Sequence, residues 1–165
     1  MSYSVERYHD ISCGHRVVGH EGKCRHLHGH NYRVTFTCAS DGAVLDNIGR
    51  VIDFGVVKSL LCMWIEEHWD HKFLIWEKDE LMLEAFPACG PDVVSEHHQI
   101  WKESLVILPF NPTAENMAEY LVDVIGPQQL SGTGVMLTHC KVEETRKCSA
   151  SYTRIQHDVR GNYER

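Results

Sequence analysis

Hydrophobic and polar residues alternate along several stretches of the chain, and alternation with a period of two is typical of a strand with one buried face. The pattern is clearest over 30–39, where Tyr32, Val34 and Phe36 share one face and strand-forming residues are frequent. It is looser over 3–15. The sequence therefore predicts strands over 3–15, 30–39, 134–142 and 149–155, with an Asp41-Gly42 turn after the second.

The spacing of apolar residues changes to three and four from Val56, which predicts a helix as far as about Trp69. A short strand over 51–54 precedes it. A second helix begins after Pro112 with Thr113 as its N-cap and is stopped by Gly126-Pro127. This order predicts an α+β domain in which an antiparallel sheet carries two helices on one face. The less regular segment 72–111 suggests a helix over 77–86, a loop over 87–91 and a strand over 105–108.

Length and composition limit the function classes. The 165 residues fit one domain, 1–165, and we expect an insertion within 72–111. The net charge of −7 disfavours nucleic acid and anionic membranes as partners, although Arg16, Lys23 and Arg25 could bind a small anion. Seven cysteines without a C-x-x-C pair argue against a disulfide framework. Neither a membrane span nor a signal peptide is evident, so we expect a cytoplasmic protein.

Three histidines are candidate metal ligands. His28 and His30 are two residues apart on a predicted strand, so both side chains leave the same face, and His15 ends the preceding strand. Three histidines around zinc leave a fourth position open for water or substrate, as in catalytic sites. Two alternatives stay open: His28 and His30 merely form hydrogen bonds around a turn, or His20 or His26 replaces His15 as the third ligand.

Cys24 is a candidate for acid–base or nucleophilic chemistry. It lies between Lys23 and Arg25, and neighbouring cations favour the thiolate form of a cysteine. Most cysteines are instead small buried hydrophobic residues without chemistry, and this interpretation fits Cys38, Cys62, Cys140 and Cys148.

Two carboxylates also have both structural and functional interpretations. Asp70-His71 follows the first predicted helix, where a histidine can simply favour the helix dipole, or where the aspartate can orient an imidazole for proton transfer. Glu144 ends a predicted strand and is either solvated or a partner for the paired N–H donors of a guanidine-like heterocycle.

Five sequence blocks together resemble one known family, that of 6-pyruvoyl-tetrahydropterin synthase and 6-carboxytetrahydropterin synthase. The resemblance covers the chain from Tyr8 to Tyr152, with the blocks in the family's order. They are Cys24-x-x-x-His28-Gly29-His30-Asn31-Tyr32, Ile52-Asp53-Phe54-Gly55-x-x-Lys58, Asp70-His71, Asn111-Pro112-Thr113-Ala114-Glu115-Asn116 and Val142-Glu143-Glu144-Thr145.

The resemblance implies a tunnelling fold (T-fold), in which the sheets of three subunits join into a barrel and two trimers stack as a homohexamer. It also implies a role for each matching residue. Cys24 is similar to the catalytic thiolate, Asp70 with His71 to a proton-shuttling pair supplied by a neighbouring subunit, and Glu144, with Thr113 nearby, to the pterin anchor. The zinc (Zn2+) ligands are implied to be His15, His28 and His30.

The family's substrate is 7,8-dihydroneopterin triphosphate, and the Cys-x-x-x-His-x-His spacing resembles the carboxytetrahydropterin branch. The implied products are 6-carboxy-5,6,7,8-tetrahydropterin, acetaldehyde and triphosphate, on the route to queuosine and other 7-deazaguanines. One alternative is a 6-pyruvoyl-tetrahydropterin synthase, and another is a non-catalytic zinc- or pterin-binding member. A zinc amide hydrolase is disfavoured because the chain is too short for the barrel in which His-x-His commonly serves hydrolysis.

Overall fold

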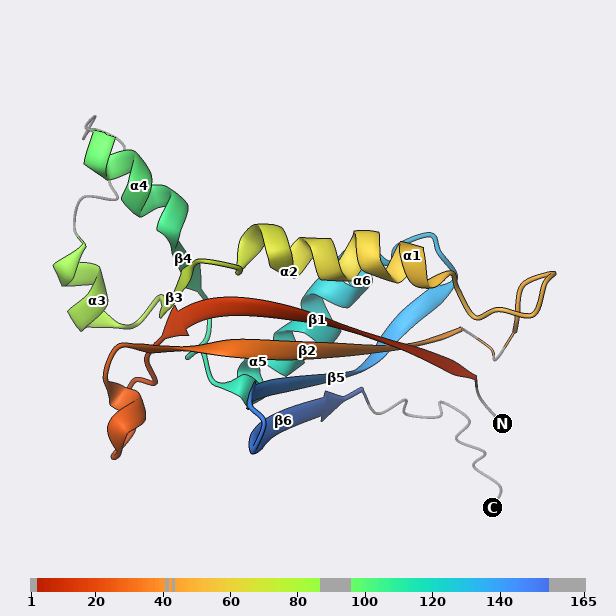
Figure 1. Cartoon of the computed structure of the whole chain (residues 1–165), viewed down its shortest axis with the longest axis horizontal. Helices are drawn as coiled ribbons and strands as arrows, with labels where there is room; N and C mark the ends of the chain where they lie inside the picture. The colour runs from red at the N-terminus through yellow and green to blue at the C-terminus, as the bar shows by residue number, and fades with distance from the viewer. Residues whose placement is uncertain (1–2, 41, 43, 87–95, 155–165) are drawn as a thin grey trace, which may run out of the picture.

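The computed structural model of the chain describes residues 3–40, 42, 44–86 and 96–154 (Figure 1). Six strands form one sheet in the order β4-β3-β1-β2-β5-β6. Asp41 of the predicted Asp41-Gly42 turn and the whole of the predicted loop over 87–91 lie outside the described residues. The strands are β1 (Ser4–His15), β2 (His28–Ser40), β3 (Phe73–Trp76), β4 (Leu105–Leu108), β5 (Val135–Thr145) and β6 (Cys148–Thr153).

The four main strands are those that alternation predicts, and they pair antiparallel, β1 with β2, β2 with β5 and β5 with β6. The prediction of an antiparallel sheet is nevertheless wrong as a whole, because β3 runs parallel to both β1 and β4. Each of these parallel neighbours is reached by a connection that contains helices, as parallel pairing requires. The sheet is therefore mixed.

Two helical stretches cover the sheet. The first consists of α1 (Phe54–Val57), the π-helical turn η3 (Lys58–Cys62) and α2 (Met63–His68), and the second of α5 (Ala114–Tyr120), the π-helical turn η5 (Leu121–Ile125) and α6 (Gly126–Gln129). Shorter helices are η1 (Lys23–Arg25), α3 (Glu80–Ala85) and α4 (Glu96–Ser104). Among the described residues, no helix is long and apolar enough to cross a membrane.

Two local predictions are wrong. The residues 51–54 do not form a strand; instead, the Asp53 carboxylate accepts a hydrogen bond from the Gly55 N–H and caps a helix that begins at Phe54. Gly126-Pro127 does not stop the second helical stretch. The π-helical turn η5 precedes it, and Pro127 then falls in the first turn of α6, where its missing N–H is tolerated.

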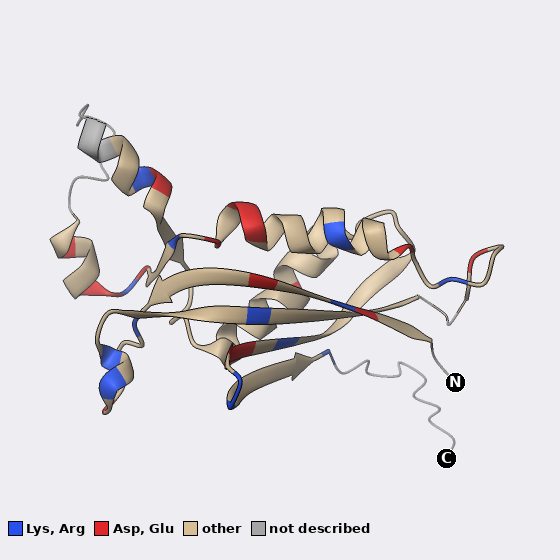
Figure 2. Ribbon diagram, in the orientation of Figure 1, with Lys and Arg blue, Asp and Glu red and all other residues tan. Residues whose placement is uncertain are grey.

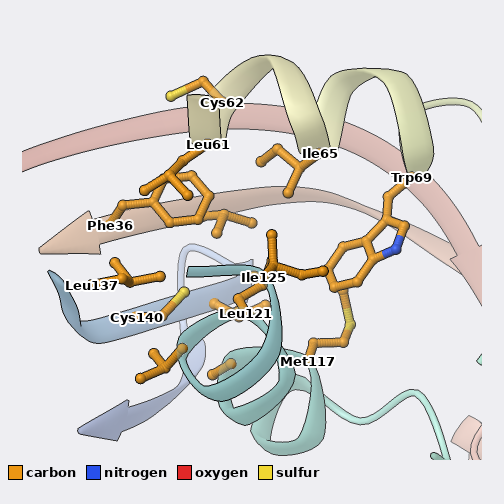
Figure 3. Packing of buried hydrophobic residues seen from close by; sticks show 14 of the residues in the cluster. Phe36, Leu61, Cys62, Ile65, Trp69, Met117, Leu121, Ile125, Leu137 and Cys140 are labelled. Carbon is orange, nitrogen blue, oxygen red and sulfur yellow. The ribbon is translucent and has the colours of Figure 1, made fainter. Parts of the chain in front are cut away.

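Both helical stretches pack on the same face of the sheet, which confirms that part of the predicted architecture. Figure 3 shows Leu61, Ile65 and Trp69 from the first stretch facing Met117, Leu121 and Ile125 from the second. Phe36 of β2 and Leu137 of β5 belong to the same buried cluster. The opposite face of the sheet is polar. There Arg33 donates two hydrogen bonds to the Asp10 carboxylate, and Figure 2 shows charged residues along these strands.

The cysteines divide by burial. Cys38, Cys62 and Cys140 are buried as predicted, and desolvation raises the pKa of Cys38 to about 12, which makes it inert. The prediction for Cys148 is wrong: it is exposed, because β6 is the edge strand and Cys148 opens it directly after a turn.

A candidate three-histidine metal centre

Strand pairing brings the three histidines together. His15 is the last residue of β1 and lies opposite His28, the first residue of β2, while His30 follows on the same face. One ligand atom from each imidazole lies within 4.8 Å of the others, and the described residues of the chain hold this one such group of histidine, cysteine or carboxylate side chains. The period-two spacing of His28 and His30, together with the end of β1, accounts for the arrangement.

Backbone carbonyls orient two of the rings. His15 Nδ1–H donates to the Pro112 carbonyl at 2.6 Å, and His28 Nδ1–H donates to the His26 carbonyl at 2.7 Å. Because a carbonyl can only accept, the lone pair of each neutral ring is at Nε2, the atom left for a metal. The Nε2 of His30 is buried without a hydrogen-bond partner. An unpartnered buried nitrogen beside two oriented rings fits a metal ion.

The electrostatics favour neutral imidazoles, which is the form that binds metals. Burial lowers the pKa of His15 to about 4, against the Pro112 hydrogen bond and with help from the other two histidines. Burial also lowers the pKa of His30, although Glu144 opposes that shift. The Tyr32 hydroxyl lies 3.0 Å from His15 Nε2, within hydrogen-bond distance. This hydrogen bond would have to break before His15 Nε2 could bind a metal.

Glu144 lies beside the histidines on β5. Its two carboxylate oxygens are each 4.0 Å from an Nε2 atom, one on His15 and one on His30, which is within ion-pair range but too long for a hydrogen bond. Its side chain is 26% exposed, so it also faces solvent. A cavity of about 280 Å³ opens here, and its wall includes Cys24, Thr113 and Glu144.

Asp70 and His71 form an oriented pair directly after α2. The Asp70 carboxylate accepts from the Ser12 N–H at 2.7 Å and from His71 Nδ1–H at 2.6 Å. Partial burial works against ionisation of Asp70, but these hydrogen bonds outweigh it and lower its pKa. The His71 ring is thereby held with Nε2 free, in the tautomer that can accept a proton.

The His71 backbone is strained. Its φ of 55° lies in the left-handed region, and it is the one residue other than glycine with such a φ among the described residues. Its N–H donates to the Ser12 carbonyl at 2.7 Å, so β1 holds it in this conformation. Strain in a residue that has a reactive side chain is typical of functional sites.

The predicted site residues line three cavities that share some of their members. Cys24 lines the 280 Å³ cavity, whereas Asp70 and His71 line a wider one of about 1240 Å³ together with His30. Glu144 lines both. His71 also lines a third cavity, of about 600 Å³, with His28 and His30. The structure therefore brings the three histidines and Glu144 together, with Cys24 and Thr113 in one adjoining cavity and the Asp70–His71 pair in another.

The alternative ligands have other roles here. His26 contributes its carbonyl to His28, and His20 Nδ1 accepts from the Gly22 N–H, so neither belongs to the histidine group. The three basic residues expected to bind a small anion, Arg16, Lys23 and Arg25, do not all remain available for one. Arg16 is paired with an acidic residue instead, because its Nε lies 2.9 Å from Asp79 Oδ2. Figure 2 shows basic residues on η1, where Lys23 and Arg25 are exposed.

Sequence reasoning missed several neighbours of the site. The sequence pattern offers His20 only as an alternative ligand and Cys148 only as a core residue, but both line the 280 Å³ cavity. The Pro112 carbonyl, which orients His15 across 97 positions of sequence, has no local signal. The left-handed conformation of His71 could not have been found either, since that position usually favours glycine.

A mixed sheet with two helical stretches on one face and a three-histidine group at a strand end defines a small α+β protein with a candidate metal centre. The sequence model of the 6-pyruvoyl tetrahydropterin synthase family matches residues 4–155, so the chain belongs to that family. The match spans all six strands and every residue of the site.

Named relatives agree with this membership. The chain is 32% identical over 139 residues to the 6-carboxy-5,6,7,8-tetrahydropterin synthase of Rickettsia felis, covering 84% of this chain and 91% of that protein. The Rickettsia bellii protein of the same name is 33% identical with the same coverage.

Solved structures share the fold. An uncharacterized protein from Wolinella succinogenes superposes with a TM-score of 0.81 at 25% identity, covering 94% of this chain and 99% of that chain. The Caenorhabditis elegans 6-pyruvoyl tetrahydropterin synthase gives a TM-score of 0.60 at 21% identity, covering 94% and 97%. The tunnelling-fold architecture of the subunit is thus confirmed.

Proposed function

We propose that this protein is a zinc-dependent lyase that converts 7,8-dihydroneopterin triphosphate to 6-carboxy-5,6,7,8-tetrahydropterin, acetaldehyde and triphosphate. The observation that carries the proposal is the group of three histidines beside a cavity lined by Cys24, Thr113 and Glu144. The relatives named 6-carboxy-5,6,7,8-tetrahydropterin synthase support the same reaction, since the chain covers 91% of their length.

His15, His28 and His30 are the proposed zinc ligands, and the cation would supply a Lewis acid for the hydroxyl groups of the substrate side chain. Three imidazole nitrogens suit zinc and leave a position for substrate. The Pro112 and His26 carbonyls keep two of the rings in the tautomer that presents Nε2. These residues hold and orient; they need not move protons.

Glu144 is the proposed anchor of the pterin ring, with Thr113 on the same cavity wall. A carboxylate that accepts two N–H groups of a guanidine-like edge forms a bidentate, charge-assisted pair. Such a contact would fix the pterin ring, and the side chain of the pterin would then extend towards His15 and His30, whose Nε2 atoms each lie 4.0 Å from a Glu144 oxygen.

Cys24 and His71 are the proposed proton-transfer groups, with Asp70 holding the His71 imidazole. Cys24 and His71 line different cavities of one chain, and the family resemblance implies that a neighbouring subunit supplies the Asp70–His71 pair of each site. We therefore propose the homohexamer, a dimer of trimers, as the active assembly. We also propose that the segment 72–111, in which α3 and α4 lie, contains an insertion into the domain.

The decisive experiment incubates zinc-loaded protein with 7,8-dihydroneopterin triphosphate and analyses the pterin and acetaldehyde by mass spectrometry. Carboxytetrahydropterin with a matching amount of acetaldehyde is the expected result, and it would fit a place in 7-deazaguanine and queuosine synthesis. A pyruvoyl product without acetaldehyde would instead assign the other branch of the family. Bound zinc without turnover would favour a binding protein.

A further inference from the structure

The loop between the ligands His15 and His28 carries Cys24 and is held together mainly by its own backbone. The Val17 N–H donates to the Cys24 carbonyl at 2.8 Å, which closes the loop on itself. The His20 N–H donates to the Val17 carbonyl at 3.3 Å. These bonds shape the loop, but they do not attach it to the rest of the domain.

The Asn111 side chain attaches the loop to the domain. Its Oδ1 accepts from the Val18 N–H at 3.0 Å, and its Nδ2 donates to the Val18 carbonyl at 2.9 Å. One amide thus pairs with both polar backbone groups of a residue 93 positions away in the sequence. Val18 follows Val17, the residue that binds the Cys24 carbonyl. Asn111 is therefore linked to Cys24 through the hydrogen bonds of two adjacent residues, Val18 and Val17.

Asn111 itself is held firmly. Its carbonyl accepts from Asn116 Nδ2 at 2.9 Å, which ties it to α5. The next residue, Pro112, orients the His15 ring, and Thr113 caps α5 and lines the cavity. A single segment thus touches the Cys24 loop, a metal ligand and the cavity wall.

A second attachment lies at the start of the loop. Arg16 Nε is 2.9 Å from Asp79 Oδ2, and Asp79 is buried as the N-cap of α3. The two atoms are close but not aligned for a hydrogen bond, so we treat the contact as an ion pair. It restrains the residue directly after His15, whereas the Asn111 pairing restrains Val18, beside the residue whose N–H binds the Cys24 carbonyl.

We propose that Asn111 is a positioning residue that holds Cys24 against the cavity shared with Thr113 and Glu144. Without its amide, both polar backbone groups of Val18 lose their partner, and the loop is free to move with Cys24. The proposal rests on the proposed function only for the consequence that turnover falls. The position of Cys24 can be tested without any substrate.

The test compares Asn111→Ala and Asn111→Asp with the wild type and with Asn47→Ala, a change at an exposed residue far from the loop in sequence. Alanine removes both hydrogen bonds. Aspartate keeps the acceptor for the Val18 N–H but places a carboxylate oxygen against the Val18 carbonyl, which keeps the test usable if alanine fails to fold. The measurements are zinc content, melting temperature, Cys24 alkylation by iodoacetamide followed by tandem mass spectrometry, kcat and KM.

Both Asn111 variants are expected to keep zinc. Cys24 alkylation is expected to be about fivefold faster in Asn111→Asp, the ratio that follows from losing one hydrogen bond, and faster still in Asn111→Ala, which loses two. We expect kcat to fall by about tenfold or more with KM nearly unchanged, because a small misplacement of a reacting group is costly. Unchanged alkylation would overturn the proposal, as would zinc loss in proportion to lost activity, which would show an effect through His15. If the wild type has no turnover, the proposed function fails and the alkylation rates still decide the role of Asn111.

Discussion

The histidine group and the Asp70–His71 pair differ most in burial. The His15 side chain is 1% exposed, and its ring orientation comes from a carbonyl on a distant segment. The His71 side chain is 84% exposed, and its orientation comes from the adjacent Asp70 and from a strained backbone. Burial disfavours the charged form of the His15 imidazole, which suits a proposed metal ligand, whereas the imidazole of His71, the proposed proton-transfer group, faces solvent.

The different surroundings of these imidazoles suit the two tasks proposed for them. Removing a member of the first group should change metal content. Removing a member of the second should change turnover while metal content stays constant. The following experiments test that separation.

The largest effect is expected from His28→Ala. Losing one of three ligands should weaken zinc binding by more than the ~10–100-fold that follows from removing an orienting partner. Zinc per subunit, measured by plasma emission spectrometry after dialysis, is expected to fall to a small fraction with loss of turnover. Full zinc occupancy in this variant would contradict the ligand assignment. His68→Ala, at an exposed histidine of α2, is the matched control and should retain zinc.

Cys24→Ala and His71→Ala are expected to lower kcat by about 10²–10⁴-fold, the usual contribution of a proton-transfer group. Both variants should retain full zinc, because neither side chain belongs to the histidine group. Steady-state kinetics and metal analysis on the same samples separate the two effects. If Cys24→Ala loses zinc, the thiolate is itself a ligand and the comparison drawn above fails.

Glu144→Gln is expected to weaken pterin binding by about 10–100-fold, since it replaces a charge-assisted hydrogen bond by a neutral one. Titration of the variant with a pterin, followed by fluorescence, measures the affinity directly. Glu143→Gln is the neighbouring control, because that carboxylate pairs with Lys141 at 3.2 Å. Equal pterin affinity in the wild type and Glu144→Gln would place the ring elsewhere.

The smallest effect is expected from Thr113→Val, which removes the hydroxyl that accepts from the Asn116 N–H at the start of α5. Loss of an N-cap lowers the free energy of unfolding by about 1 kcal/mol and the melting temperature by ~2–4 °C. Thr113→Ser keeps the hydroxyl and should melt like the wild type. A wild-type melting temperature for the valine variant would show that the cap contributes nothing.

Local patterns were sufficient to predict much of the fold and the centre of the site. Alternation located the four main strands, and helical spacing located both helical stretches on one face. His28 and His30 share a face because side chains in a strand repeat every two residues, and pairing of two neighbouring strands adds His15. Such patterns succeed because their physics involves residues close in sequence.

The tertiary structure decided what depends on distant contacts. It placed β3 parallel to β1 and β4 parallel to β3, and it exposed Cys148 by placing β6 at the sheet edge. It also aligned the His15 ring with Pro112, and it separated His71 from Cys24. The sequence by itself therefore determined which side chains can form the site, because strand and helix periods are local. The orientation and protonation of those side chains follow from burial and from hydrogen bonds across the fold, which no local pattern encodes.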